Sequence, residues 1–121
     1  MVKTIVIVED NALNMKLFDE VLRAYGYCTV LSPDGEDIVE IVHDHSADLI
    51  VMDVQLPNRS GLELSKMLKS DARLKHLPVL AVTAFAAQLN ERQLEEAGCD
   101  HCISKPISIP EFLSIVASYL S

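Results

Sequence analysis

Five short apolar runs alternate along the chain with longer segments whose apolar residues recur at helical spacing. The runs that we expect to form strands lie at residues 4–8, 27–31, 49–52, 79–82 and 101–104. Most of them are apolar throughout, which is typical of parallel strands covered on both faces. Right-handed crossovers through the intervening helices would give a doubly wound α/β domain with a parallel five-stranded sheet.

The first and last helical segments each carry apolar residues that we expect to face the core. These residues are Leu13, Leu17, Val21 and Ala24 in the first segment, and Ile109, Phe112, Leu113, Val116 and Leu120 in the last. The S-x-x-E spacing at 60–63 and 108–111 predicts two capped helix starts. Gly26 and Gly98 stand where a helix needs a residue that tolerates positive φ, and predict two helix ends.

The composition limits the class of protein. The 121 residues suit one compact domain spanning 1–121, and a net charge of −8 with scattered Lys and Arg argues against nucleic-acid binding. No apolar run reaches the roughly 18 residues of a membrane span, and we expect neither a signal peptide nor membrane insertion. Three cysteines without a secretory signal favour a reduced, cytoplasmic setting.

Cys99 and Cys102 have the C-x-x-C spacing of redox and zinc sites. A structural zinc site normally needs a second ligand pair, and a redox pair normally begins a helix. Here the pair follows the expected helix end at Gly98 and runs into an expected strand. We therefore interpret both cysteines as structural.

Polar residues follow four of the expected strands, and all would lie at one edge of a parallel sheet. They are Glu9 and Asp10 after the first strand, Asp53 after the third, Thr83 after the fourth and Lys105 after the fifth. Three crowded carboxylates repel one another unless a cation lies among them, and Mg2+ prefers such oxygen ligands. With a lysine, a hydroxyl and a carboxylate nucleophile, this set favours phosphoryl transfer through an acyl phosphate.

Each of these residues also has an ordinary explanation. An Asp at a strand end is often a helix cap, a lysine is usually a surface residue, and Thr83 is β-branched and suits a strand. Only their joint placement on four strand ends favours a functional site.

Several segments together resemble the receiver domain of bacterial response regulators, over residues 2–120. They lie at 9–10, 53–61, 82–85 and 104–106, and the phrases at 8–11, 13–18 and 103–108 resemble single-domain cell-cycle regulators of alphaproteobacteria. The resemblance implies a (βα)5 receiver fold, which is flavodoxin-like, with strand order 2-1-3-4-5. It also implies a two-component phosphorelay protein acting in cell-cycle or cell-division control.

The resemblance implies a role for each site residue. Asp53 would be the phosphoacceptor. Mg2+, for which Mn2+ can substitute, would be bound by Asp10 and Asp53, by the backbone carbonyl of Gln55, and by Glu9 through water. Lys105 would pair with the phosphoryl group, or with Asp53 before transfer.

The resemblance also implies a switch. The Lys105–Pro106 bond would be cis, and Thr83 would move toward a phosphoryl oxygen together with the loop that starts at Ala84. Receivers commonly carry Tyr or Phe three residues before the lysine, where this chain has Cys102. Our hypothesis is that Phe85, or a backbone shift of loop 84–89, carries the switch instead.

The five βα units fill the chain, so the output is expected to go through partners. These would be a histidine kinase or phosphotransfer protein, and a downstream protein that binds the face formed by residues 90–117. Asn14, Met15 and Phe18 on the first helix are candidates for kinase docking, although Met15 and Phe18 suit a core equally well. We expect a monomer or weak dimer in the cytoplasm, which partners can recruit to a cell pole.

Three other functions are compatible with parts of the pattern. A chemotaxis-type regulator or phosphate sink would share every site residue. A haloacid-dehalogenase-type phosphatase needs a second Asp two residues after the nucleophile, where Gln55 stands, so we expect no enzyme activity beyond self-phosphorylation and dephosphorylation. A flavin-binding protein would need a Ser/Thr/Gly-rich phosphate loop where Glu9 and Asp10 lie.

Overall fold

The computed structural model describes residues 2–85 and 88–120, and within them five strands alternate with five helices. The strands are β1 (Thr4–Val8), β2 (Cys28–Ser32), β3 (Leu49–Asp53), β4 (Val79–Thr83) and β5 (His101–Ser104). The helices are α1 (Ala12–Ala24), α2 (Ile38–Asp44), α3 (Gly61–Ser70), α4 (Glu91–Ala97) and α5 (Ile109–Leu120). Neighbouring strands are parallel in the order β2-β1-β3-β4-β5, so the expected doubly wound sheet is confirmed.

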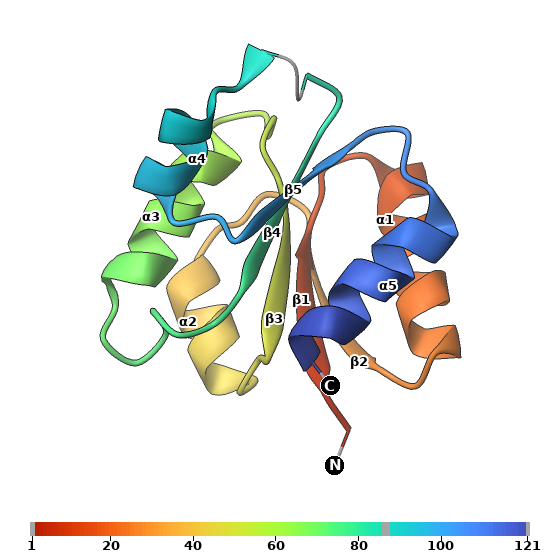
Figure 1. Cartoon of the computed structure of the whole chain (residues 1–121). Helices are drawn as coiled ribbons and strands as arrows, with labels where there is room; N and C mark the ends of the chain where they lie inside the picture. The colour runs from red at the N-terminus through yellow and green to blue at the C-terminus, as the bar shows by residue number, and fades with distance from the viewer. Residues whose placement is uncertain (1, 86–87, 121) are drawn as a thin grey trace.

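The sheet lies between two layers of helices (Figure 1). Helices α1 and α5 cover one face, and α2, α3 and α4 cover the other. Successive side chains of a strand point to opposite faces, so Ile5 and Ile7 pack under α1 and α5 while Val6 and Val8 pack under α2 and α3. None of the described helices is long and apolar enough to cross a bilayer.

Three of the four predicted helix ends have the expected geometry, and α5 begins at Ile109, directly after Ser108. Ser60 caps α3 by accepting a hydrogen bond from the Leu62 N–H, and Gly26 and Gly98 have φ of 90° and 76°. The complete capping box, however, lies at 90–93 in α4, where an Asn and a Gln take the roles of the usual Ser and Glu.

The predicted core face of α1 is wrong. Leu13 and Leu17 are 79% and 41% exposed, whereas Phe18 and Leu22 are buried. The reason is that α1 packs its Phe18 side against α5, where the Phe18 and Phe112 ring centroids are 5.2 Å apart. The predicted face of α5 is confirmed at Phe112, which is fully buried.

Phe18 is therefore a core residue, and Met15 packs in part on the same core. The large apolar side chains that α1 exposes are instead Leu13 and Leu17.

Candidate functional site

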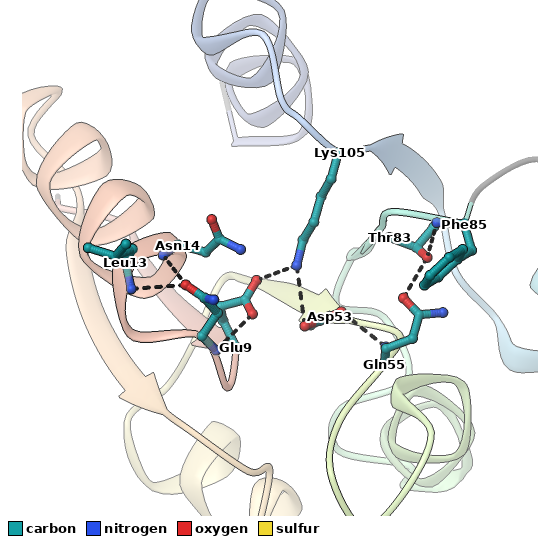
Figure 2. A network of polar contacts seen from close by, with 9 residues as sticks. Glu9, Leu13, Asn14, Asp53, Gln55, Thr83, Phe85 and Lys105 are labelled. Atoms are coloured by element: carbon teal, nitrogen blue, oxygen red, sulfur yellow. Dashed lines mark hydrogen bonds and ion pairs between the residues drawn. The ribbon is translucent and has the colours of Figure 1, made fainter.

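The carboxyl ends of β1, β3, β4 and β5 converge on one polar cluster (Figure 2). Parallel pairing aligns Asp53 with Val82, and Thr83 with Ser104 just before Lys105. Glu9, Asp53 and Thr83 are all buried at this edge. The structure thus brings together the strand-end residues that the sequence singled out.

The three carboxylates lie close enough to share a metal ion. One oxygen each from Glu9, Asp10 and Asp53 lies within 4.8 Å of the others. Asp10 is exposed to solvent and the other two are buried. Because all the donors are oxygens and the group carries three negative charges, it fits a hard divalent cation such as Mg2+.

The environment of Asp53 disfavours its charged form. Burial, followed by the neighbouring Glu9, raises the pKa of the Asp53 carboxyl to about 7. The charge of Lys105 and the Gln55 N–H, which donates to Asp53 Oδ1 at 3.0 Å, act the other way. A cation bound beside Asp53 would likewise lower the pKa of its carboxyl group and favour the ionised form.

Lys105 bridges two carboxylates rather than pairing with Asp53 alone. Its Nζ lies 2.8 Å from Glu9 Oε1 and 3.3 Å from Asp53 Oδ2. Burial alone would lower the pKa of Lys105, but the hydrogen bond to Glu9 and the two negative charges outweigh it and raise the pKa. The Lys105–Pro106 peptide bond is cis, as the sequence resemblance implies.

The side chain of Gln55 has a contact that the sequence did not predict. Thr83 Oγ1 donates to Gln55 Oε1 at 2.7 Å, and the same hydroxyl accepts from the Phe85 N–H at 3.0 Å. Ala84 and Phe85 are exposed. Of the loop expected to carry the switch, residues 86 and 87 lie outside the part of the chain that the structure describes.

Gly61 explains why the segment after Asp53 closes back on the site. A Cβ on Gly61 would collide with the backbone carbonyl oxygen of Asp53. The Gly61 N–H also donates to the Val54 carbonyl at 2.8 Å. Position 61 therefore requires a glycine, because the backbone of Asp53 lies too close for any side chain. The only sequence signal for this requirement was that Gly61 lies in the 53–61 segment that resembles receiver domains.

The two cysteines of the C-x-x-C pair are partly buried. Burial raises the pKa of both thiols, and Cys99 Sγ lies 3.5 Å from Ser65 Oγ. A raised pKa disfavours the thiolate that metal and redox chemistry use. Cys102, which stands where the sequence resemblance implies an aromatic residue, also lines a hollow of about 340 Å³ with Ser104 and Ile115.

Comparison with known proteins identifies the family and close relatives. Residues 5–117 match the response regulator receiver domain. The polar-differentiation response regulators DivK of Brucella ovis and Brucella anthropi are each 49% identical over 120 residues, which is 99% of this chain and 98% of theirs. DivK is the regulator type whose phrases the sequence resembles at 8–11, 13–18 and 103–108.

Solved structures agree with the fold. A CheY-like receiver domain from Methylobacillus flagellatus has a TM-score of 0.86 at 28% identity, covering 98% of this chain and 99% of that one. The receiver domain of a sensor histidine kinase from Pseudomonas aeruginosa, with a magnesium ion in its active-site cleft, has a TM-score of 0.88 at 28% identity and covers 98% of each chain. The fold, the converging strand-end residues and the near full-length match together show that this chain belongs to the response regulator receiver domain family, as a DivK-like member.

Proposed function

We propose that this chain is a single receiver domain, spanning 1–121, that accepts a phosphoryl group on Asp53 in a Mg2+-dependent two-component phosphorelay. The observation that carries the proposal is the position of Asp53. Its carboxyl group is buried beside two further carboxylates, and Lys105 Nζ lies 3.3 Å from it. A carboxylate that accepts a phosphoryl group needs a metal site on one side and a positively charged side chain, here Lys105, on the other.

The residues at the strand edge fit the implied metal. Asp10, Asp53 and the carbonyl of Gln55 would hold Mg2+, with Glu9 acting through water, and Mn2+ can take the same oxygen ligands. When bound, the ion supplies positive charge that neutralises the oxygens of the transferred phosphoryl group. In the structure the two Glu9 oxygens accept from Lys105 Nζ and from the Asn11 N–H, and Lys105 would leave Glu9 for the phosphoryl group when that group arrives.

The transfer itself uses the Asp53 carboxylate as nucleophile. One Asp53 oxygen bonds to the phosphorus of a phosphohistidine, the P–N bond breaks, and its electron pair remains on the imidazole nitrogen. The Lys105 ammonium offsets charge on the phosphoryl oxygens. Later attack of water on the acyl phosphate returns inorganic phosphate and free Asp53, so the chain turns over only its own phosphoryl group.

A groove beside Lys105 suits the docking of the phosphoryl donor. The groove has a volume of about 320 Å³, and its lining includes Asn14 and Leu17 of α1 with Lys105 and Ile107 after β5. Leu17 is 41% exposed, so an apolar helix of a histidine kinase or phosphotransfer protein can pack on it. Of the three candidates on α1, Asn14 lines this groove beside Leu17, and the largely buried Phe18 lines it from the core, whereas Met15 is not part of its lining.

The signal would leave through a change of shape. Thr83 turns toward a phosphoryl oxygen and moves the loop that begins at Ala84, with Phe85 taking the part of the aromatic residue that Cys102 replaces. The face of residues 90–117 then binds a downstream protein. The 49% identity to regulators named for polar differentiation supports a role in cell-cycle and cell-division control, in a cytoplasmic monomer or weak dimer that partners recruit to a cell pole.

A chemotaxis-type regulator or phosphate sink would use the same residues with another partner. The DivK relatives favour cell-cycle control. A pull-down with the phosphorylated chain that recovers a flagellar-motor protein, and no histidine kinase, would favour the chemotaxis alternative.

The direct test is phosphorylation by acetyl phosphate in Mg2+, followed by intact mass. We expect the native chain and the control variant Asp44→Asn, which alters an exposed carboxylate on α2, to gain one phosphoryl group. Asp53→Asn and a chelated sample should gain none. Labelling of Asp53→Asn to the native extent would contradict the assignment.

A further inference from the structure

Gln55 connects the phosphoacceptor to the switch residue. Its N–H donates to Asp53 Oδ1 at 3.0 Å, and its side-chain oxygen accepts from Thr83 Oγ1 at 2.7 Å. Figure 2 shows the Thr83 hydroxyl directed at the Gln55 amide. A hydroxyl has one hydrogen to donate, so Thr83 cannot donate to a phosphoryl oxygen while it donates to Gln55.

The two ends of this hydrogen bond differ in how firmly they are held. The backbone around Gln55 is fixed, because the Val54 N–H donates to Val82 O at 3.0 Å and residues Gln55 and Ser60 form a β-bridge. Thr83 leads directly into the exposed turn at Phe85, whose side chain is 49% exposed. Gln55 is therefore an anchor on rigid backbone for a residue at the start of an exposed loop.

The burial of the two groups favours the resting orientation. Thr83 is fully buried, so its hydroxyl needs a protein acceptor in place of water. Gln55 is exposed, and its amide can return to water when the hydrogen bond breaks. A charged phosphoryl oxygen is a stronger acceptor than a neutral amide, so phosphorylation can displace Gln55 although Gln55 opposes it.

We propose that Gln55 is a positioning residue whose amide oxygen holds Thr83 in the resting orientation and so sets how readily the domain enters the phosphorylated conformation. The inference rests on the proposed function, in which Thr83 turns toward the phosphoryl group. It assigns to the Gln55 side chain a role separate from that of its backbone carbonyl. It also predicts that removing the Gln55 amide oxygen makes entry into the phosphorylated conformation easier and not harder.

Binding of beryllofluoride, a phosphoryl mimic, tests the inference by isothermal titration calorimetry in Mg2+. Gln55→Met keeps the length of the side chain and removes the acceptor. We expect it to bind beryllofluoride about three- to tenfold more tightly than the native chain, the usual effect of one hydrogen bond. In a Thr83→Val background the same substitution should change the affinity less than about twofold, because the hydroxyl is already absent.

Two results would overturn the inference. One is an unchanged or weakened affinity for beryllofluoride in Gln55→Met. The other is an equal gain in the native and Thr83→Val backgrounds, which would mean that Gln55 acts without the Thr83 hydroxyl.

A second measurement separates failure of this inference from failure of the proposed function. In the ligand-free protein, the NMR resonance of the Thr83 methyl group should shift in Gln55→Met, whatever the protein binds. An unmoved methyl resonance would overturn the role of Gln55. Absence of beryllofluoride binding by the native chain would instead overturn the proposed function.

Discussion

Two groups of side chains in the described part of the chain are close enough to hold a cation, and they lie in very different surroundings. The strand-edge group consists of Glu9, Asp10 and Asp53, and the α2 group consists of Glu40, His43 and Asp44. Strand pairing brings the first group together from positions far apart in the chain, and two of its members are buried. The second group occupies neighbouring turns of one helix and is fully exposed.

The difference shows that proximity of carboxylates alone does not make a site. In the strand-edge group, burial raises the pKa of Asp53 to about 7, so the charges there cost free energy that a cation can recover. In the α2 group, water solvates the charges and Arg73 lies 3.9 Å from Glu40. A metal ion would gain little from that group and would be repelled by the guanidinium.

The largest difference between the strand-edge group and the α2 group should be in their affinity for Mg2+. We expect Asp10→Asn to weaken Mg2+ binding at least tenfold, because a unit charge next to a cation is worth on the order of a few kcal/mol at an effective dielectric of ~20. Asp44→Asn should change the affinity less than about twofold. Calorimetric titration of Mg2+ checks both, and equal effects of the two substitutions would remove the distinction between the groups.

Next in size is the pH dependence of stability in chelated protein. The pKa of Asp53 is about 7 in the folded chain and 3.8 in an unperturbed carboxyl group, so the folded state binds more protons between these values. Stability therefore falls as pH rises through that window, and the loss is complete above about pH 7. Asp53→Asn should raise the free energy of unfolding by roughly 2–4 kcal/mol at pH 8, and by much less near pH 4.

Urea unfolding with a chelator at the two pH values measures this effect. Asp44→Asn serves as the control, since its carboxyl group is exposed. A stabilisation by Asp53→Asn that is the same at both pH values would show that the gain does not come from the buried charge.

The sequence predicted the strand-edge group because a few rules place it. Apolar runs predict parallel strands, and parallel strands end at one edge, so Glu9, Asp53 and Lys105 had to meet whatever the helices did. The α1 core face could not be predicted in the same way. Leu13 and Leu17 have the spacing of a core stripe, and only packing against α5 shows that Phe18 is buried in their place.

The Gln55 contact was beyond sequence reasoning for a related reason. Its partner Thr83 is 28 residues away, and the hydrogen bond depends on side-chain rotamers at two strand ends. The Gly61 contact with Asp53 is similar, because it depends on how the loop after β3 folds back. The Gln55 contact has no local sequence signal, whereas the place of Gly61 in the 53–61 segment indicates a constrained position without showing which contact constrains it.

The smallest effect belongs to the exposed α2 group. Glu40→Gln removes a partner of Arg73 at 3.9 Å on the surface, and we expect a change of about 0.5 kcal/mol or less in the free energy of unfolding. The effect should disappear in about 1 M salt, since the pair is screened there. A change above about 2 kcal/mol by urea unfolding would mean that this group has a structural role comparable to that of the strand-edge group.

Mapping the phosphoryl group tests the central claim most directly. The protein is phosphorylated with acetyl phosphate and Mg2+ and then reduced with borohydride, which converts an aspartyl phosphate to homoserine. Its peptides are then sequenced by mass spectrometry. Homoserine at position 53, with Glu9 and Asp10 unmodified, is the predicted result. Reduction at position 10, or phosphate on a serine or histidine with Asp53 intact, would contradict the account.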